Sequence, residues 1–116
     1  MQMTSLKNKI IIVTGSEGDI GKVIVERLRK KGAIVYGFDI KKGIDITDFN
    51  DITNLINLIK NKHKRIDILI NNAAITVGDW EEIIDTNLTA PATLSKLVST
   101  HMYKYGGSII NITSLW

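Results

Sequence analysis

The chain has 116 residues, a hydrophobic content of 44%, no cysteine and a formal net charge of +3. The length suits one domain or part of one, and the absence of cysteine excludes a disulfide framework and a thiolate zinc site. The first eight residues lack the apolar core of a signal peptide and the first strand-like run is too short to cross a bilayer, so we expect a cytoplasmic protein without a membrane partner.

The sequence alternates strand-like and helix-like segments. Residues 9–14 form a continuous β-branched run, which is typical of a strand buried on both faces of a parallel sheet. Apolar residues then recur at helical spacing from Ile20 until Gly32 ends the helix. The further expected elements are strands at 33–38 and 43–47, a helix capped by Asp48, a strand at 66–71, a helix at 80–105 and a strand at 107–113.

One residue interrupts the long helix expected at 80–105. Pro91 lacks a backbone N–H, so we expect it to bend or break this helix. The residues expected on the apolar side of the same helix are Ile83, Ile84, Leu88, Leu94, Leu97 and Val98. The alternation as a whole predicts βαβ units, and hence an α/β doubly wound parallel sheet in three α/β/α layers with strand order 3-2-1-4-5.

Three glycines stand between the first strand and the first helix. Gly15, Gly18 and Gly21 have the spacing G-x-x-G-x-x-G, which in this context is typical of dinucleotide binding. The first glycine permits a tight turn, the second a close approach of backbone to pyrophosphate, and the third close helix–sheet packing. The amides at the helix N-terminus are suited to bind phosphate. We therefore interpret residues 1–116 as a single NAD-binding, Rossmann-like domain.

An acidic residue follows the second strand. Asp39 stands 18 residues after Gly21, where a carboxylate can accept hydrogen bonds from the adenosine ribose hydroxyls. The same carboxylate would repel a 2′-phosphate, which favours NAD over NADP. Lys41 and Lys42 leave NADP open as the less favoured alternative, because either could neutralise that phosphate.

Positive charge is concentrated in two short runs, at residues 27–31 and 60–65. Both fall at the ends of expected helices, where cations interact favourably with the terminal carbonyl groups. Aromatic residues that could stack on bases are not interleaved with either run, so we expect no nucleic-acid partner. His63 and His101 stand alone, without a carboxylate or second histidine at metal spacing, and we expect no metal site.

The order of motifs resembles the N-terminal portion of the short-chain dehydrogenase/reductase family over nearly the whole chain. Residues 14–21 match the glycine motif, and residues 45–48 resemble the stretch that lies against the adenine. Residues 71–74 match the N-N-A-G motif with Ala74 in place of glycine. Residues 87–89 resemble the segment with the active-site asparagine, and 107–114 match the fifth strand with Ser114 at the catalytic serine.

This resemblance implies a cofactor, a reaction and a set of site residues. The cofactor is a nicotinamide dinucleotide, and hydride passes between it and a carbonyl or secondary alcohol, on a sugar-derived or acyl substrate. Ser114 and Asn87 are the implied catalytic residues, and Asn87 holds a water in the proton relay. The implied cofactor-binding residues are Thr14, Gly15, Ser16, Gly18, Asp19, Ile20, Gly21, Asp39, Ile40, Asp45, Ile46, Asn72, Ala73 and Ala74.

The chain departs from the family pattern in its glycine spacing and in two short connections. Asp19 stands where the main branch has its second glycine, and the spacing resembles that of the branch that acts on nucleotide sugars. Only five residues separate Asp39 from Asp45, which leaves no room for the usual intervening helix. Only twelve separate Ala74 from Asn87, which trims a loop on the substrate side.

The family's Y-x-x-x-K pair is absent from these residues. Four residues after Tyr36, Tyr103 and Tyr105 stand Ile40, Gly107 and Ile109. In the family the tyrosine transfers the proton to or from the substrate oxygen and the lysine lowers the pKa of that tyrosine, so Ser114 and Asn87 alone orient a substrate at most. The sequence stops at Trp116, and we expect a sheet that is incomplete after the fifth strand.

Three functions remain open on this basis. The chain is a short-chain oxidoreductase or its N-terminal part, a nucleotide-binding module or truncated remnant without catalysis, or an interaction fragment that requires a partner chain. The outer edge of the fifth strand would carry unpaired backbone N–H and C=O groups, which are a template for pairing with another chain. We therefore also expect a homo-oligomer.

Overall fold

Four parallel strands form the centre of the molecule. The computed structural model describes residues 5–102 and 104–113, and within them the strands lie in the order β2-β1-β3-β4. The strands are β1 (Ile10–Thr14), β2 (Ile34–Phe38), β3 (Ile68–Asn71) and β4 (Ser108–Asn111). The helices are α1 (Asp19–Lys30), α2 (Phe49–His63), α3 (Trp80–Ile84) and α4 (Ala90–Ser99), with a 3₁₀ turn η1 (Ile40–Lys42) and a π turn η2 (Asp85–Thr89).

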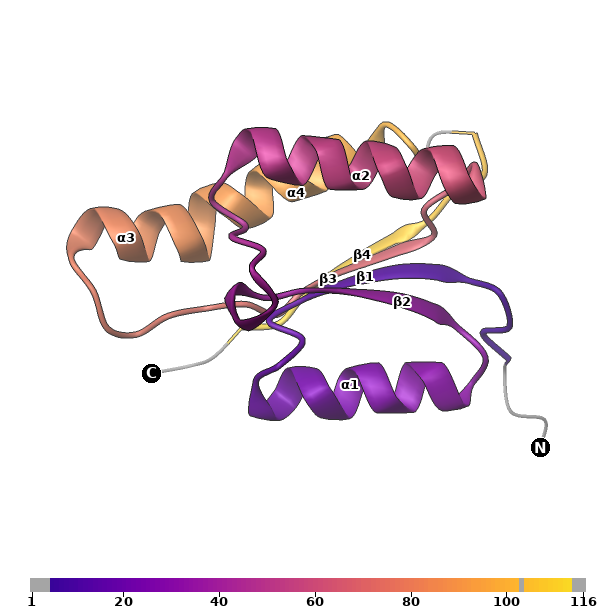
Figure 1. The fold of residues 1–116 in the computed structure, drawn as a ribbon, viewed down its shortest axis with the longest axis horizontal. Coiled ribbons are helices and arrows are strands. Elements are labelled where there is room, and N and C mark those ends of the chain that lie inside the picture. The colour runs from indigo at the N-terminus through magenta and orange to yellow at the C-terminus, as the bar shows by residue number, and fades with distance from the viewer. Residues whose placement is uncertain (1–4, 103, 114–116) are drawn as a thin grey trace.

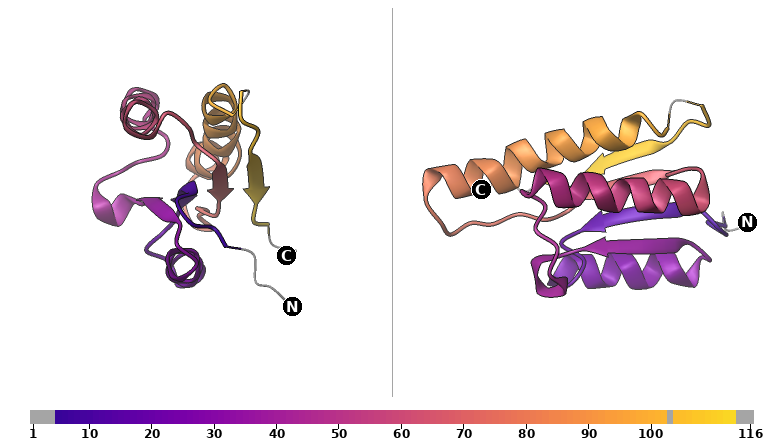
Figure 2. Two further views of the ribbon diagram at one scale, coloured as in Figure 1. Left: turned by 90° about the vertical axis from the view of Figure 1, so that its right-hand side faces the viewer. Right: turned by 45° about the horizontal axis from the view of Figure 1, so that its top comes forward.

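The helices cover the two faces of the sheet unequally. α1 lies on one face, and α2 and α4 lie on the other (Figures 1 and 2). The side chains of β1 alternate between two buried clusters: Ile10 and Ile12 face α2 and α4, whereas Ile11 and Val13 face α1. All four are at most 2% exposed, which confirms that this β-branched run is a strand buried on both faces. The three-layer α/β arrangement with a parallel sheet is confirmed as well.

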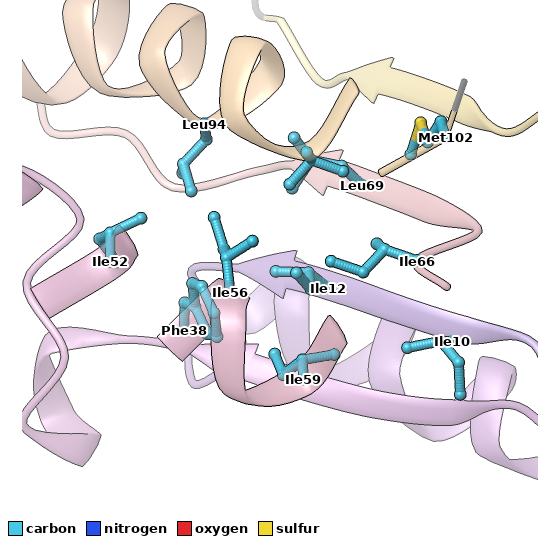
Figure 3. Packing of buried hydrophobic residues seen from close by; sticks show 11 residues of the cluster. Ile10, Ile12, Phe38, Ile52, Ile56, Ile59, Ile66, Leu69, Leu94 and Met102 are labelled. Atoms are coloured by element: carbon cyan, nitrogen blue, oxygen red, sulfur yellow. The ribbon is translucent and has the colours of Figure 1, made fainter. Parts of the chain in front are cut away.

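The larger cluster joins α2 and α4 to the sheet. Ile52, Ile56 and Ile59 follow one face of α2 and reach strands β1 and β2, while Leu94 reaches them from α4 (Figure 3). Because α2 and α4 share this core, each helix fixes the position of the other over the sheet.

Local sequence explains where the helices begin and end. The Asp48 side chain accepts a hydrogen bond from the backbone N–H of Asp51 at 3.1 Å and caps α2, as the sequence predicts. Gly32, with a φ of 92°, directly follows the end of α1 and allows the chain to turn into β2. Asp79 caps α3 by accepting a hydrogen bond from the N–H of Glu82 at 2.9 Å.

The strand expected at 43–47 is wrong. After Asp39 the chain makes the 3₁₀ turn η1, reverses at Gly43, whose φ is 77°, and runs irregularly into α2. Ile44 and Ile46 alternate as in a strand, but they pack against the cluster under α2 rather than pairing with β2. The five-residue connection from Asp39 to Asp45 is too short to place a further strand along the outer edge of β2. The observed strand order is therefore the expected order without its third strand.

β2 is consequently an outer strand in the described part of the chain. The N–H of Ile34 donates to the carbonyl of Lys9, and the carbonyl of Phe38 accepts from the N–H of Gly15, so these two residues of β2 face β1. Because alternate residues of a parallel strand face opposite edges, the carbonyl of Val35 faces the outer edge. There it accepts a hydrogen bond from Nη2 of Arg29 at 3.1 Å. An α1 side chain thus occupies part of the edge at which a further strand would otherwise pair.

The long helix expected at 80–105 ends at Ser99, and its hydrogen-bond pattern changes before Pro91. In η2 the N–H of Ala90 bonds to the carbonyl of Asp85, five residues earlier, rather than to the one four residues earlier. Pro91 occupies the first turn of α4, where its missing N–H is best tolerated. The helix therefore changes register at Pro91 instead of breaking, and α3, η2 and α4 run on continuously (Figure 1).

β4 lies at the other outer edge of the sheet. Its residues are exposed, including Ile109 and Ile110, and β3 is its only strand partner within residues 5–102 and 104–113. Association through this edge stays a prediction. In the same described residues, no helix combines the length and hydropathy that a membrane span requires.

The shared core yields a test of the fold. Leu94 is 1% exposed and Leu58, on α2, is 65% exposed. We expect Leu94→Ala to lower the free energy of unfolding by about 2–5 kcal/mol, because it leaves a cavity between α4 and the sheet. Leu58→Ala, the matched control, should change it by about 0.5 kcal/mol or less. Urea denaturation followed by circular dichroism measures both, and equal effects would contradict this packing.

Candidate functional site

A cavity of about 640 Å³ opens at the carboxyl ends of β1, β2 and β3, beside the N-terminus of α1. Its size falls in the range of small-molecule sites, and in open parallel sheets ligands bind at this edge. It is lined by Gly15, Gly18, Asp19, Ile20, Phe38, Asp39, Ile40, Ile44, Asp45, Ile46, Thr47, Asn72, Ala73, Ala74, Ile75, Glu82, Asp85 and Thr86.

Most of the residues that the resemblance assigns to the cofactor meet at this cavity, although they come from three separate segments. Thr14, Ser16 and Gly21 are the exceptions, because they lie behind the lining rather than in it. Thr47 belongs to the 45–48 stretch, but the motifs did not point to Phe38, Ile44, Ile75, Glu82, Asp85 or Thr86. For Glu82, Asp85 and Thr86 the only indication in the sequence was the short connection between Ala74 and Asn87, which brings α3 close to the strand ends.

The glycines allow backbone segments to approach each other closely. A Cβ atom on Gly15, whose φ is 66°, would lie 2.9 Å from Cα of Ala73. A Cβ on Gly21 would overlap the carbonyl group of Gly15, so only glycine lets α1 start this near the loop. At Gly18 a Cβ would make an ordinary 3.5 Å contact, and this residue contributes to the lining of the cavity.

Thr14 and Asn72 join the two loops beneath the cavity. The buried Oγ1 of Thr14 accepts hydrogen bonds from the backbone N–H of Asn72 at 3.0 Å and of Ala73 at 2.9 Å. In return, Nδ2 of Asn72 donates to the carbonyl of Gly15 at 3.2 Å. Thr14 therefore acts behind the site, where it fixes the distance between the end of β1 and the end of β3.

The N-terminus of α1 points backbone donors toward the cavity. Gly18 occupies the N-cap position and makes no side-chain capping bond. The N–H groups of Asp19, Ile20 and Gly21 belong to the first turn, which has no carbonyl partners inside the helix. These donors and the positive end of the helix dipole can together bind an anionic group such as pyrophosphate.

Asp39 holds the acidic wall of the cavity in place. Its Oδ2 accepts a hydrogen bond from the N–H of Glu17 and its Oδ1 from that of Lys41, both at 2.9 Å. The carboxylate thus links the glycine loop to η1 and keeps lone pairs for a ligand hydroxyl. Neither Lys41 nor Lys42 lines the cavity.

A second cavity of about 780 Å³ adjoins the first and shares Ala73, Ala74 and Ile75 with it. Asn87 lines this cavity and bonds to the backbone of Ile75 through both ends of its side-chain amide. Oδ1 of Asn87 accepts a hydrogen bond from the N–H of Ile75 at 2.9 Å, and Nδ2 of Asn87 donates to the carbonyl of Ile75 at 2.8 Å. Because Pro91 has no N–H, the carbonyl of Asn87 lacks the donor that an α-helix would supply four residues later. Thr113 lines this cavity, whereas Ser114 lies outside the described residues.

The two histidines, His63 and His101, lie outside the two cavities. Nε2 of His63 lies 2.6 Å from the hydroxyl of Tyr36, and burial together with nearby Lys60 lowers the pKa of His101. The described residues contain no group of three or more metal-ligating side chains placed to hold an ion.

Comparison with known proteins identifies the family. The short chain dehydrogenase family model matches residues 40–116. The chain belongs to the short chain dehydrogenase family. Membership implies a nicotinamide dinucleotide cofactor.

Individual relatives agree with this assignment. A 3-oxoacyl-(acyl-carrier-protein) reductase of Haemophilus influenzae is 38% identical over 95% of the chain and 57% of its own length. A short chain dehydrogenase/reductase of Gibberella zeae is 35% identical over 97% of the chain and 54% of its own. A C-terminal deletion mutant of Thermoplasma acidophilum aldohexose dehydrogenase superimposes with a TM-score of 0.84 and 32% identity, over 94% of this chain and 51% of that one. The chain spans about half the length of the curated relatives it matches.

The relatives are also longer within the matched region. The alignment with the Gibberella zeae protein extends over 145 positions, although this chain has only 116 residues. That protein therefore contains residues which this chain lacks, as the short connections after Asp39 and Ala74 lead us to expect.

The close approach of α1 to the glycine loop yields a second test. We expect Gly21→Ala to lower the free energy of unfolding by about 1–3 kcal/mol, because the new methyl group forces α1 away from Gly15. Gly18→Ala adds the same methyl group where φ is −80° and space is available, so it should cost about 1 kcal/mol or less. Chemical denaturation of both variants measures the difference, and equal losses would contradict the geometry described for this loop.

Proposed function

We propose that this chain binds NAD in the first cavity, in preference to NADP, and forms the cofactor-binding part of an oxidoreductase. The observation that carries the proposal is the convergence of the glycine loop, Asp39 and the Asn72–Ala74 segment on one cavity at the N-terminus of a helix. Residues 1–116 act as a single domain in this proposal. The bound cofactor would supply hydride exchange with a carbonyl or secondary alcohol.

The residues fit a dinucleotide in successive parts. The first-turn amides of α1 would hold the pyrophosphate, and the Asp39 carboxylate would accept hydrogen bonds from the adenosine ribose hydroxyls. Asp45 and Ile46 line the region proposed for the adenine. Ala73, Ala74 and Ile75 connect this cavity to the next, so the nicotinamide end would reach the second cavity along them.

The second cavity suits an uncharged substrate. Its polar lining consists of amides and hydroxyls, among them Asn71, Ser95 and Asn111, and none of its described lining residues carries a charge. Asn87 would hold a water through its backbone carbonyl, and Ser114 would orient the substrate oxygen. A sugar-derived or acyl carbonyl compound fits this lining, and the relatives named above act on compounds of both kinds by their names.

A second candidate is a nucleotide-binding module without catalysis. It is favoured by one observation, which is that no tyrosine of this sequence is followed four residues later by lysine. Since the general acid and its lysine are absent from these residues, the two candidates share the cofactor and differ in turnover.

Cofactor preference tests the first candidate. Titration calorimetry should show tighter binding of NADH than of NADPH. Asp39→Asn should reduce that preference by about tenfold, because it removes the charge that repels the 2′-phosphate. A tenfold change in the affinity ratio corresponds to about 1.4 kcal/mol. Asparagine retains an acceptor for one of the two backbone amides. Asp48→Asn, which removes a charge outside the cavity, is the control. Equal affinity for both cofactors in the unmodified chain would overturn the NAD assignment.

Turnover separates the two candidates. We expect no measurable dehydrogenase activity from these 116 residues alone, because a positioned general acid contributes about 10²–10⁴-fold to such rates. The absorbance of the reduced nicotinamide, followed against sugars, ketones and acyl substrates, measures it. Activity that persists through purification and is lost in Ser114→Ala would show that the missing tyrosine is not required.

A further inference from the structure

The first cavity has an unusual distribution of charge for a site that receives phosphates. Asp19, Asp39 and Asp45 line it from the motif segments, and Glu82 and Asp85 line it from α3 and η2. No lysine or arginine is among the described lining residues. The two ion pairs seen in residues 5–102 and 104–113, Lys30 with Glu26 and Arg65 with Asp67, lie elsewhere. Among the groups that line the cavity, the backbone N–H groups at the N-terminus of α1 are therefore the ones suited to an anion, while Lys41 and Lys42 follow Ile40 just outside the lining.

Glu82 and Asp85 reach the cavity because the connection before α3 is short. Only residues 75–79 separate Ala74 from the first residue of α3. At one end of this connection, both groups of the Asn87 side-chain amide hold the backbone of Ile75. At the other end, Asp79 caps the helix through the N–H of Glu82. α3 is thus tied beside the strand ends, and its first turn faces the cavity.

The Glu82 carboxylate lies close to the connection before α3. Gly78 has a φ of 146°, and a Cβ there would lie 2.7 Å from Oε2 of Glu82. Glu82 also contributes to the lining of the first cavity, as Ile75 does. Glu81, its neighbour in the same turn, does not line the cavity.

We propose that Glu82 and Asp85 are specificity-determining residues, which disfavour dinucleotides carrying an extra phosphate by charge repulsion across the cavity. This inference rests on the proposed binding of a nicotinamide dinucleotide in the first cavity. Asp39 acts at the ribose itself, whereas Glu82 and Asp85 act at longer range, from α3 and η2, without contacting the ligand. They add to the preference for NAD through the total charge of the ligand.

The mechanism predicts an unusual dependence on salt. Both carboxylates are exposed, so their field is screened over a Debye length of about 8–10 Å near physiological ionic strength. Repulsion of NADPH, the more highly charged ligand, should weaken most as salt is added. The affinity ratio of NADH to NADPH should therefore fall between low and moderate salt.

The experiment compares two double variants with equal net charge. In Glu82→Gln/Asp85→Asn, the affinity ratio of NADH to NADPH at low salt should fall by about threefold to tenfold, and most of its salt dependence should be lost. In Glu81→Gln/Asp51→Asn, which removes two exposed carboxylates outside the cavity lining, the ratio should stay within about twofold of the unmodified chain. Calorimetry at two salt concentrations gives the ratios, and thermal melting verifies that each variant is folded.

The outcomes separate this inference from the function on which it rests. An unchanged ratio in Glu82→Gln/Asp85→Asn, or an equal change in both double variants, would overturn the role of these two residues while leaving cofactor binding intact. Failure of the unmodified chain to bind either NADH or NADPH would overturn the proposed function and this inference together.

Discussion

The hydroxyl of Thr14 is the point on which the carboxyl edge of the sheet depends. Its oxygen accepts hydrogen bonds from the backbone N–H groups of Asn72 and Ala73, and so joins the loop after β1 to the loop after β3. Because Thr14 is 1% exposed, water does not reach these N–H groups in place of its hydroxyl. A buried N–H group left without an acceptor would lower the stability of the fold. The close approach of Gly15 to Ala73 and the start of α1 against Gly15 both require this spacing. The floor of the first cavity is therefore a product of backbone packing rather than of side chains that touch a ligand.

The two cavities are joined through residues 73–75. This short segment forms one wall of each, and Asn87 holds its last residue with both ends of the side-chain amide. A nucleotide bound on one side and a substrate on the other would share the same backbone. The proposed cofactor and substrate would thus meet along one backbone segment, without a separate domain interface.

Sequence reasoning succeeded where structure depends on local pattern. The buried run of β1 and the cap at Asp48 follow from the β-branched pattern and from capping, which are properties of neighbouring residues. It failed at residues 43–47, where Ile44 and Ile46 alternate as in a strand but have no edge within reach. Glu82 and Asp85 were missed for a related reason. Their place at the cavity depends on the length of a connection and on how α3 docks, neither of which a motif contains.

The contact between Arg29 and Val35 has a consequence for how such a sheet can shorten. A strand at the edge of a sheet contributes few buried side chains, but it satisfies the backbone groups of its neighbour. Here one guanidinium, reaching from α1, satisfies the Val35 carbonyl at the free edge of β2 and places a charge where another chain would have to pair. A single long side chain on a neighbouring helix thus substitutes for part of a strand. The first cavity opens at the carboxyl ends of β1, β2 and β3, so β2 contributes to it although no further strand pairs along its outer edge in the described residues.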